Sequence, residues 1–349
     1  MHKLNVLIAG STGYIGVQLI KLLIKHKNIH IKYLCGNSSV GKNISFYDKS
    51  LNKYKLPKIV KFNKKYLNQV DVVFTALPNG EAQILSNLLM PNNVLIDLSA
   101  DFRISKPSVY KKFYKISHKS KSNIAKSIYF LPEINNSKLN HYKIISCPGC
   151  YPTSILIPII PLLKNKLVNK KNIIIDSKSG YSGAGRSVHK KHKNKNLYDS
   201  LSAYGVGFHR HNSEINQEFA KISKNIIYSF TPHLSPMFRG ILSTIYLDLP
   251  KGSSGKKIFL FLKKQFKNKE FIKFSKFNEP ISTNDVINSN NCLLSICETK
   301  YKNKIILFSA IDNLIKGGAG QGVQNMNIYY GLGEALGLKW KNYLLHLFY

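Results

Sequence analysis

The chain has 349 residues, is 44% hydrophobic and carries a formal net charge of +35 at pH 7. Two domains with separate cores are possible at this length, whereas no apolar run approaches the ~20 residues of a membrane-spanning helix, and five irregularly spaced cysteines favour a reducing cytoplasm over a disulfide framework. The charge does not indicate a specific nucleic-acid partner, because only four of the 52 basic residues are arginine and the lysines are spread along the whole chain.

The first half of the chain alternates predicted strands with predicted helices. Apolar runs predict strands at 4–10, 29–36, 71–77 and 94–99. Helices are expected after the first and third of these strands, ending near Lys27 and Met90, and residues 105–127 predict a loop with short helical pieces. This alternation is typical of a parallel sheet with helices on both faces.

A glycine-rich turn joins the first strand to its helix. Gly10, Gly13 and Gly16 form a GxxGxxG pattern, one residue longer than the usual dinucleotide fingerprint. A strand precedes the pattern and a helix opens within it, so backbone N–H groups at the helix start can hold a pyrophosphate. The turn therefore predicts a dinucleotide site.

The end of the second strand bears on which dinucleotide binds. An NAD site usually places Asp or Glu there, where the carboxylate binds the ribose 2′-hydroxyl. This chain has Ser38, Ser39 and Lys42 instead, and no carboxylate before Asp48. Because hydroxyl groups and a cation suit a 2′-phosphate, we expect NADP; the alternative is that these are ordinary loop residues.

A cysteine lies at the next junction between a strand and a helix. Residues 143–147 predict a short strand, 153–163 predict a buried helix, and a Pro-Gly turn precedes Cys150 between them. Unpaired N–H groups and the helix dipole favour negative charge at such a position, so we expect a lowered thiol pKa. Cys150 is therefore the candidate nucleophile; the alternative is a small buried core cysteine.

The predicted strands of the second half are more widely spaced. They cover 173–177, 226–231, 241–249 and 305–310. Helices are predicted at 256–266 and 323–332. Because simple strand–helix alternation is lost, this half predicts a mixed or antiparallel sheet, and the whole chain predicts an α/β protein with a second, α+β part.

Two histidines flank an arginine in the second half. His209, Arg210 and His211 are followed by Glu214, whose carboxylate can orient an imidazole ring. An imidazole can accept the proton of a thiol and return a proton to an intermediate near neutral pH. Arg210 can clamp a carboxylate or a phosphate.

Two loops and one strand end carry the other three arginines. A glycine-rich loop at 176–186 ends in Arg186, and the segment 231–240 places Arg239 before a strand. Both are candidate anion sites, with a flexible turn as the alternative for the first. Arg103 follows a polar strand end where the first sheet would face the cofactor.

No residue spacing predicts a metal site. His189 and His192 lie in a lysine-rich loop, and Cys292 and Cys297 lack further ligands at metal-binding spacing. We therefore expect no metal.

Together, these motifs closely resemble those of the N-acetyl-γ-glutamyl-phosphate reductase family, NADPH-dependent enzymes of arginine biosynthesis in the semialdehyde dehydrogenase superfamily. The matching segments are GSTGYIG at 10–16, ALPNG at 76–80, DLSADFR at 97–103, PGCYPT at 148–153, SKSGYSGAGR at 177–186, HRH at 209–211, FTPHLSPMFRGILST at 230–244 and DNLIKGGAGQGVQN at 312–325. As a set they are highly specific. The departures are Cys147, where the family often has Asn or another residue, and Asn212-Ser213 in place of Thr-Pro.

The resemblance implies a fold, a reaction and an assembly. The expected fold is a Rossmann dinucleotide-binding domain at 1–149, joined by a C-terminal helix at 317–349, and a catalytic α+β domain with a mixed sheet at 150–316. The implied reaction is the reduction of N-acetyl-γ-glutamyl phosphate through a thioester on Cys150, in a homodimer or homotetramer. The alternative within the superfamily is an aspartate-semialdehyde dehydrogenase, against which the HRH and DLSADFR motifs argue.

The resemblance also assigns roles to individual residues. Cys150 is the nucleophile, His211 is the favoured acid/base with His209 second, and 317–325 approaches the nicotinamide. Cofactor contacts are expected from Gly10, Ser11, Thr12, Gly13, Tyr14, Ile15, Gly16, Ser38, Ser39, Lys42, Pro78, Gly183 and Asn325. Substrate contacts are expected from Arg103, Ser179, Arg186, Arg210 and Arg239, with Arg186 and Arg239 as candidates for the phosphate or carboxylate and Arg210 for the carboxylate.

Overall fold

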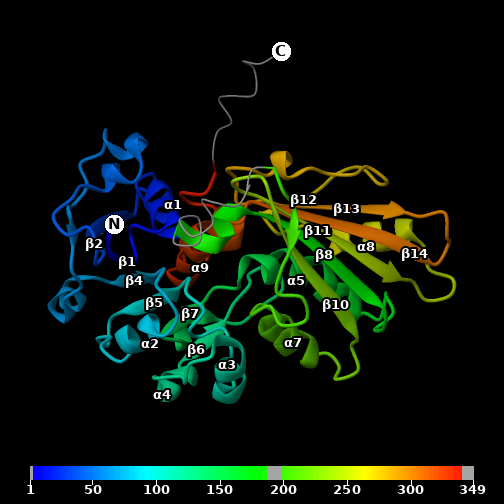
Figure 1. Cartoon of the computed structure of the whole chain (residues 1–349), viewed down its shortest axis with the longest axis horizontal. Helices are drawn as coiled ribbons and strands as arrows, with labels where there is room; N and C mark the ends of the chain where they lie inside the picture. Colours follow the sequence, from blue (N-terminus) through cyan, green and yellow to red (C-terminus); the bar gives the residue numbers. More distant parts are fainter. Residues whose placement is uncertain (1–2, 187–198, 340–349) are drawn as a thin grey trace, which may run out of the picture.

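Two seven-stranded sheets lie side by side in the computed structural model, which describes residues 3–186 and 199–339 (Figure 1). The first sheet is wholly parallel and the second is mixed. The predicted fold class is confirmed.

The first sheet is built from the N-terminal strands. They are β1 (Leu4–Ala9), β2 (Ile29–Cys35), β3 (Ile59–Val60), β4 (Val72–Thr75), β5 (Val94–Asp97), β6 (Ser127–Tyr129) and β7 (Ile144–Ser146). Their order in space is β3-β2-β1-β4-β5-β7-β6, so the chain reverses direction across the sheet between β1 and β4. Ligands of parallel α/β sheets bind outside the carboxyl ends of the strands, at such a switch point.

The helices cover both sheets and are joined by short turns. The helices are α1 (Tyr14–Leu23), α2 (Glu81–Ser86), α3 (Pro107–Tyr114), α4 (Lys121–Ile124), α5 (Cys150–Lys164), α7 (Asn212–Ala220), α8 (Gly255–Gln265) and α9 (Gly320–Tyr329). The 3₁₀ turns are η1 (Ile44–Phe46), η2 (Lys49–Leu51), η3 (Lys64–Gln69), η4 (Leu139–His141), η5 (Tyr181–Ala184) and η6 (Thr283–Asp285). The predicted short helical pieces in 105–127 are confirmed as α3 and α4.

The second sheet is built from β8 onward. Its strands are β8 (Ile173–Gly180), β9 (Ser202–Ala203), β10 (Tyr228–Ser235), β11 (Ile241–Asp248), β12 (Ile272–Phe274), β13 (Cys292–Glu298) and β14 (Lys304–Ile311), in the order β12-β13-β14-β11-β8-β10-β9. Strand β13 was not predicted, although its alternate residues are buried. Both of these cysteines, Cys292 and Cys297, are strand residues, and no group of three or more ligating side chains is found in the described parts of the chain.

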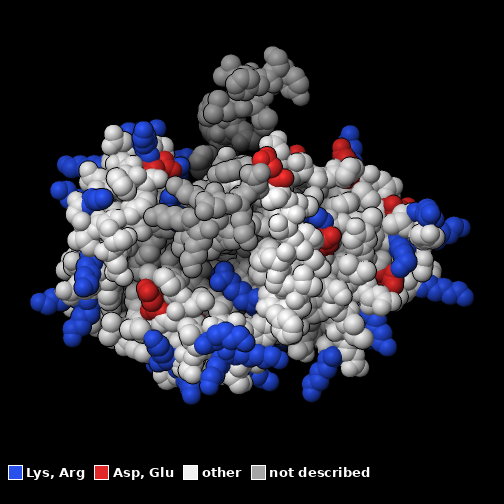
Figure 2. Space-filling view, viewed as in Figure 1, with Lys and Arg blue, Asp and Glu red and all other residues white. Residues whose placement is uncertain are grey.

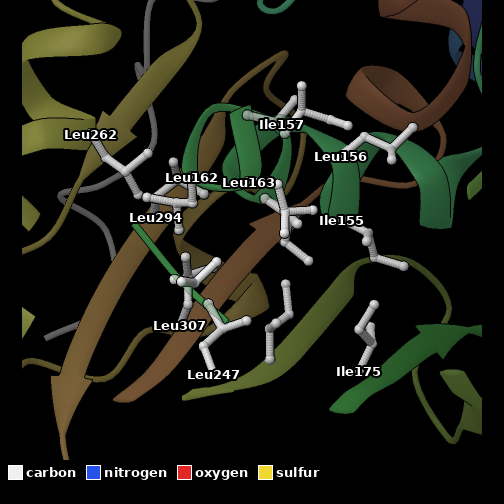
Figure 3. Packing of buried hydrophobic residues seen from close by; sticks show 14 of the residues in the cluster. Ile155, Leu156, Ile157, Leu162, Leu163, Ile175, Leu247, Leu262, Leu294 and Leu307 are labelled. Atoms are coloured by element: carbon white, nitrogen blue, oxygen red, sulfur yellow. The ribbon is translucent and has the colours of Figure 1, made fainter. Parts of the chain in front are cut away.

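Helix α5 is the buried centre of the second half. Every residue from Tyr151 to Leu163 is buried, including Pro158 and Pro161, whose missing N–H groups weaken the helix locally. Figure 3 shows the helix lying across the strands, with Ile155 beside Ile175 of β8. Because α5 is packed so completely, its first residue, Cys150, is held at a fixed position.

A π-turn and α9 return the chain to the first sheet. The turn η7 (Ile315–Ala319) follows β14 and runs directly into α9. Figure 1 shows α9 between the two halves of the molecule, where it packs against α1. The sequence predicted a C-terminal helix over 317–349, whereas α9 ends at Tyr329 and residues 330–339 form turns, with a φ of +62° at Gly331. The last ten residues, like His189 and His192, lie outside the described parts.

Lysine and arginine side chains are distributed around the visible face without forming one dense patch, as Figure 2 shows. Over residues 3–186 and 199–339, no helix is both long enough and apolar enough to cross a bilayer.

Candidate active site

A large cavity opens where the carboxyl ends of the first sheet meet the second sheet. Its volume is about 1060 Å³, and its wall includes the glycine turn, the loops after β4 and β5, the start of α5 and the turn after β14. Both the predicted dinucleotide turn and the predicted nucleophile therefore face one space.

Only part of the predicted site residues lie in the cavity wall. Those that do are Gly10, Thr12, Gly13, Tyr14, Ile15, Pro78, Arg103, Cys150, Gly183, Arg186, Arg210 and His211. The predicted residues outside the wall are Ser11, Gly16, Ser38, Ser39, Lys42, Ser179, His209, Arg239 and Asn325.

The glycine turn has the close backbone packing that a dinucleotide cradle requires. Gly10 has a φ of +85°, and a Cβ there would lie 2.2 Å from the carbonyl oxygen of Ala76. A Cβ at Gly16 would lie 2.2 Å from the carbonyl oxygen of Gly10, so both positions accept only glycine. Ser11 supports the turn from behind, since its hydroxyl donates to the carbonyl of Cys35 at 3.0 Å. The first turn of α1 holds no acidic residue, so its free N–H groups suit a pyrophosphate.

The residues proposed to read the 2′-phosphate lie beside this cradle. Ser39 is buried and shares a hydrogen bond with the hydroxyl of Tyr47, and the ammonium of Lys42 stands 4.2 Å above the ring of Phe46. Ser38 is exposed. None of the three is part of the cavity wall.

Arg186 lies at the dinucleotide turn instead of beside the nucleophile. Its Nε donates to the carbonyl of Thr12 at 3.0 Å, and its guanidinium carbon lies 4.3 Å from the ring centre of Tyr14. Arg186 comes from the loop after β8, so it reaches across the cavity from the second half of the chain. This placement fits a cofactor contact better than the substrate contact that the sequence suggested.

Cys150 is the first residue of α5, as predicted. The preceding Gly149 is the N-cap, and Gly317 of the π-turn packs against the cysteine so closely that a Cβ at 317 would lie 2.6 Å from the Cβ of Cys150. Burial raises the pKa of the Cys150 thiol, although Arg103, Arg210 and the N–H of Tyr151 act in the opposite direction. The expected lowering of the pKa is therefore wrong for the free protein, because desolvation outweighs the helix N-terminus.

The raised thiol pKa predicts how Cys150 reacts in the absence of other molecules. Because burial disfavours the thiolate, the rate of alkylation by iodoacetamide is expected to rise with pH and to have its midpoint above about 8.5, the ordinary value for cysteine. Mass spectrometry of the labelled peptide measures the rate at Cys150 separately from the other thiols. A midpoint below pH 7 would show that the helix N-terminus dominates after all.

Cys147 does not compete as a nucleophile. It is fully buried, burial raises the pKa of its thiol to about 12, and its sulfur accepts a hydrogen bond from Asn325 at 3.4 Å. Asn325 also donates to the carbonyl of Phe130 at 3.3 Å, so it joins two buried segments that lie outside the cavity wall.

His211 is the imidazole nearest to the nucleophile turn. A Cβ at Gly149 would lie 2.5 Å from Nε2 of His211, so the ring rests on the residue that precedes Cys150. Burial, with help from His209, Arg103 and Arg210, holds the pKa of His211 well below its usual range. The ring is therefore neutral at pH 7 and has a free lone pair for the thiol proton, a capacity that is lost only when the pH falls well below 6.5.

His209 supports His211 from the side. Its Nδ1 accepts the backbone N–H of His211 at 3.1 Å, and its ring packs edge-on against Tyr151 and Tyr204. Burial and Arg210 lower the pKa of His209 to about 4. His209 lies outside the cavity wall, so the geometry favours His211 as acid/base.

Glu214 has a role that the sequence did not predict. The carboxylate lies 3.9 Å from Nε2 of His211, too far for a hydrogen bond, but it accepts the N–H of Gly149 at 2.8 Å. It also accepts from Arg103 at 3.2 Å and from the hydroxyl of Tyr129 at 3.0 Å. Glu214 therefore orients the backbone turn of the nucleophile more than the imidazole ring.

The other three arginines differ in the hydrogen bonds and ion pairs that their side chains make. Arg103 is buried and also donates to the carbonyls of Cys147 and Leu98, at 2.9 and 3.1 Å. Arg239 lies outside the cavity wall and pairs with Asp312 at 3.2 Å. This ion pair joins the segment before β11 to the segment after β14. Arg210 is exposed at the cavity, and within the described residues its guanidinium donates no hydrogen bond, which leaves it available to an anionic substrate.

Asn313 and Ser182 are among the cavity residues that the sequence reasoning missed. Asn313 follows β14; its amide accepts the N–H of Gly240 at 2.7 Å and donates to Ser182 at 3.0 Å. Ser182 lies in the loop after β8 and lines the cavity. The predicted Ser179, three residues earlier, is buried, and its hydroxyl donates to the carbonyl of Gly180. The sequence signal for Asn313 was a polar Asp-Asn pair immediately after the apolar strand β14.

Comparison with known proteins gives the family. Residues 5–142 match the model of the semialdehyde dehydrogenase NAD binding domain, and residues 150–313 match that of the semialdehyde dehydrogenase dimerisation domain. N-acetyl-gamma-glutamyl-phosphate reductase of Ehrlichia canis is 40% identical over 341 residues, which are 97% of this chain and 98% of the relative. The chain belongs to the N-acetyl-gamma-glutamyl-phosphate reductase family. The reductase of Thermoanaerobacter pseudethanolicus is 41% identical, over 94% of this chain and 95% of its own length.

Solved structures agree on the fold of this reductase family member. Aspartate semialdehyde dehydrogenase II of Vibrio cholerae, complexed with ASA, superposes with a TM-score of 0.70 at 16% identity, over 95% of this chain and 99% of the other. The aspartate semialdehyde dehydrogenase of Candida albicans, solved with NADP, gives 0.63 at 17% identity, over 94% and 98%. At these identities the likeness describes the fold alone.

The contact between His211 and Gly149 gives a sharp prediction for the reductase. Gly149→Ala is expected to lower kcat by about 10²-fold, because the new methyl group displaces the imidazole by the ångström or so that such catalysis does not tolerate. The fold should persist, since Gly149 has φ −66° and ψ 159°, which alanine adopts freely. Gly333→Ala is the matched control, because a Cβ there meets nothing within 4 Å. Steady-state kinetics on both variants measures the effect, and an unchanged kcat in Gly149→Ala would contradict it.

Proposed function

We propose that the protein reduces N-acetyl-γ-glutamyl phosphate to N-acetyl-glutamate semialdehyde and phosphate, with NADPH as reductant, in arginine biosynthesis. The observation that carries the proposal is the position of Cys150, which faces the same cavity as the glycine turn while a neutral His211 rests on the residue before it.

The first half of the reaction forms a thioester. His211 accepts the thiol proton, the sulfur of Cys150 bonds to the acyl carbon, and the bond from that carbon to the phosphate oxygen breaks. Free N–H groups at the start of α5 stabilise the negative oxygen of the tetrahedral intermediate. The exposed guanidinium of Arg210 binds an anionic group of the substrate at the cavity wall.

The second half of the reaction releases the aldehyde. When bound, NADPH would supply a hydride to the thioester carbon. His211 returns the proton that it took from the thiol to the resulting negative oxygen, which gives the thiohemiacetal. As the thiohemiacetal collapses, its hydroxyl proton passes to His211, the carbon–sulfur bond breaks and Cys150 leaves as a thiolate. Gly149 and Glu214 keep the sulfur in place throughout, because the turn before Cys150 is tied to a buried carboxylate.

The cofactor assignment rests on the residues around the glycine turn. Ser38, Ser39 and Lys42 follow the second strand with no carboxylate before Asp48, and Arg186 adds a guanidinium beside Tyr14. This chemistry suits a 2′-phosphate and therefore NADP.

The working form that we propose is a homodimer or homotetramer in the cytoplasm. A match to a dimerisation-domain model and five free cysteines support this form. The domain boundaries that we propose are residues 1–149 with 317–349 for the dinucleotide domain, and 150–316 for the catalytic domain.

The reverse reaction tests the proposed function. Purified protein is incubated with N-acetyl-glutamate semialdehyde, phosphate and NADP⁺, and the absorbance of reduced nicotinamide is expected to rise. Parallel reactions contain NAD⁺ in place of NADP⁺, or aspartate semialdehyde in place of the acetylated substrate. Reduction only with aspartate semialdehyde would assign the in-class alternative, and a preference for NAD⁺ would overturn the cofactor assignment.

A further inference from the structure

A lysine with no exposed surface lies in the π-turn, next to the glycine that packs against the nucleophile. Lys316 is 0% exposed, and its ammonium bonds to Oε1 of Glu133 at 2.6 Å and to Oε1 of Gln324 at 2.8 Å. Burying a charge pair costs several kcal/mol per ion before the attraction between the two charges is counted. Packing alone therefore does not explain why this ion pair is buried.

The polar groups around Lys316 form one connected network. The amide of Gln324 donates to Glu133 at 2.9 Å and to Glu334 at 2.7 Å, while its oxygen also accepts from Asn290 at 3.0 Å. The network therefore ties together the loop after β6, the loop before β13, helix α9 and the segment after α9. Residues far apart in sequence are held at one point, since Glu133 and Lys316 are 183 positions apart.

Lys316 belongs to the π-turn η7, so the network fixes the position of this turn. π-turns are rare, and they recur at functional sites. Gly317 follows Lys316 and rests on Cys150, and a Cβ at Gly318 would lie 2.5 Å from Cδ1 of Ile15 in the first turn of α1. One turn therefore touches the two helix N-termini that matter, the one carrying the nucleophile and the one in the dinucleotide cradle.

We propose that Lys316 is a positioning residue: through Glu133 and Gln324 it anchors the π-turn that sets the sulfur of Cys150 at the correct place relative to the bound dinucleotide. The proposal rests on the proposed function. The link from Lys316 to the sulfur that the structure shows is the neighbouring Gly317, which packs against Cys150.

Three variants separate positioning from stability. Lys316→Met leaves Glu133 buried without its partner and is expected to lower both the melting temperature and kcat. In the double variant Glu133→Gln with Lys316→Met no buried charge remains, so the melting temperature should recover. Lys304→Met is the matched control, because Lys304 pairs with Asp248 at 2.5 Å on the surface with half of its side chain exposed.

The kinetic expectation is specific to positioning. The double variant should keep KM within about threefold of wild type, while kcat stays about 10- to 100-fold lower, because the reacting atoms are misplaced rather than unbound. The pH midpoint of Cys150 alkylation should not move. Recovery of kcat together with the melting temperature would overturn the proposal, and so would a shift of that midpoint or an unchanged kcat in Lys316→Met.

A binding measurement keeps this test independent of the reaction. NADP⁺ is expected to slow the alkylation of Cys150 in wild type and in Lys304→Met, and to protect it at least about threefold less in the double variant at saturating NADP⁺. Equal protection in wild type and the double variant, or no protection in wild type, would overturn the role of Lys316. Inactivity of the wild type toward N-acetyl-glutamate semialdehyde would instead refute the proposed function, and the protection experiment would still report on Lys316.

Discussion

Replacing Cys150 by serine is expected to lower kcat by about 10⁴-fold or more, because a serine hydroxyl has no accessible anion at neutral pH and cannot form the thioester. The substitution removes little volume at the start of α5, so the melting temperature and the affinity for NADP⁺ should stay close to wild type. Steady-state kinetics and isothermal titration with NADP⁺ measure the two effects separately.

Cys147→Ser is the matched control for the nucleophile. Cys147 lies three residues earlier, but it is fully buried and its thiol pKa is raised to about 12. We expect this variant to lose some stability, since a buried sulfur is replaced by a polar hydroxyl, and to keep kcat within about threefold. If Cys150→Ser retained full activity, or if Cys147→Ser were the inactive variant, the assignment of the nucleophile would be wrong.

Replacing His211 by asparagine is expected to lower kcat by about 10²- to 10⁴-fold, the usual range for loss of a general acid/base. The wild-type rate should not fall on the acid side until well below pH 6.5, because burial holds the pKa of His211 below its usual range. Without this base, the thiolate forms only by ionisation of Cys150, whose pKa is raised. The activity left in His211→Asn should therefore increase with pH through the alkaline range.

His209→Asn separates the two imidazoles. The ring of His209 lies outside the cavity wall and contacts Tyr151 and Tyr204, so its loss is expected to cost less than about tenfold in kcat and to leave the shape of the pH profile unchanged. A larger loss in His209→Asn than in His211→Asn would exchange the two roles. The pH profiles of the two variants, measured in one buffer series, decide between them.

The parts of the fold that follow from short stretches of sequence were predicted well. The strands at the start of the chain, the glycine turn and helix α5 each depend on residues within a few positions of one another, and the strand–turn–helix order alone places Cys150 at a helix start. The short strands β3, β6, β9 and β12 were not predicted, because two or three residues carry too little pattern. Strand β10 begins two residues later than predicted and continues through Pro232.

The candidate site was predictable in its residue types but not in its contacts. The sequence placed Glu214 with His211, three residues away, whereas the carboxylate bonds to Gly149 and Arg103, which are 65 and 111 positions distant. Arg186 was expected beside the substrate and lies on the dinucleotide turn, 174 positions from Thr12. These partners depend on how the two halves of the chain pack against each other, which no local pattern encodes.

Local sequence, then, was sufficient for the α/β class, the dinucleotide turn and the position of the nucleophile, because backbone geometry over a few residues is governed by their own side chains. The charge states of the site residues depend on packing between distant segments. Burial raises the pKa of Cys150, although the residue stands at a helix N-terminus, and burial keeps His211 neutral. Desolvation depends on every atom that surrounds a group, so it is known only when the two halves of the chain are seen together. The network at Lys316 is the clearest case, since the partner of its charge, Glu133, is 183 positions away and Gln324 joins two further stretches of chain to the pair.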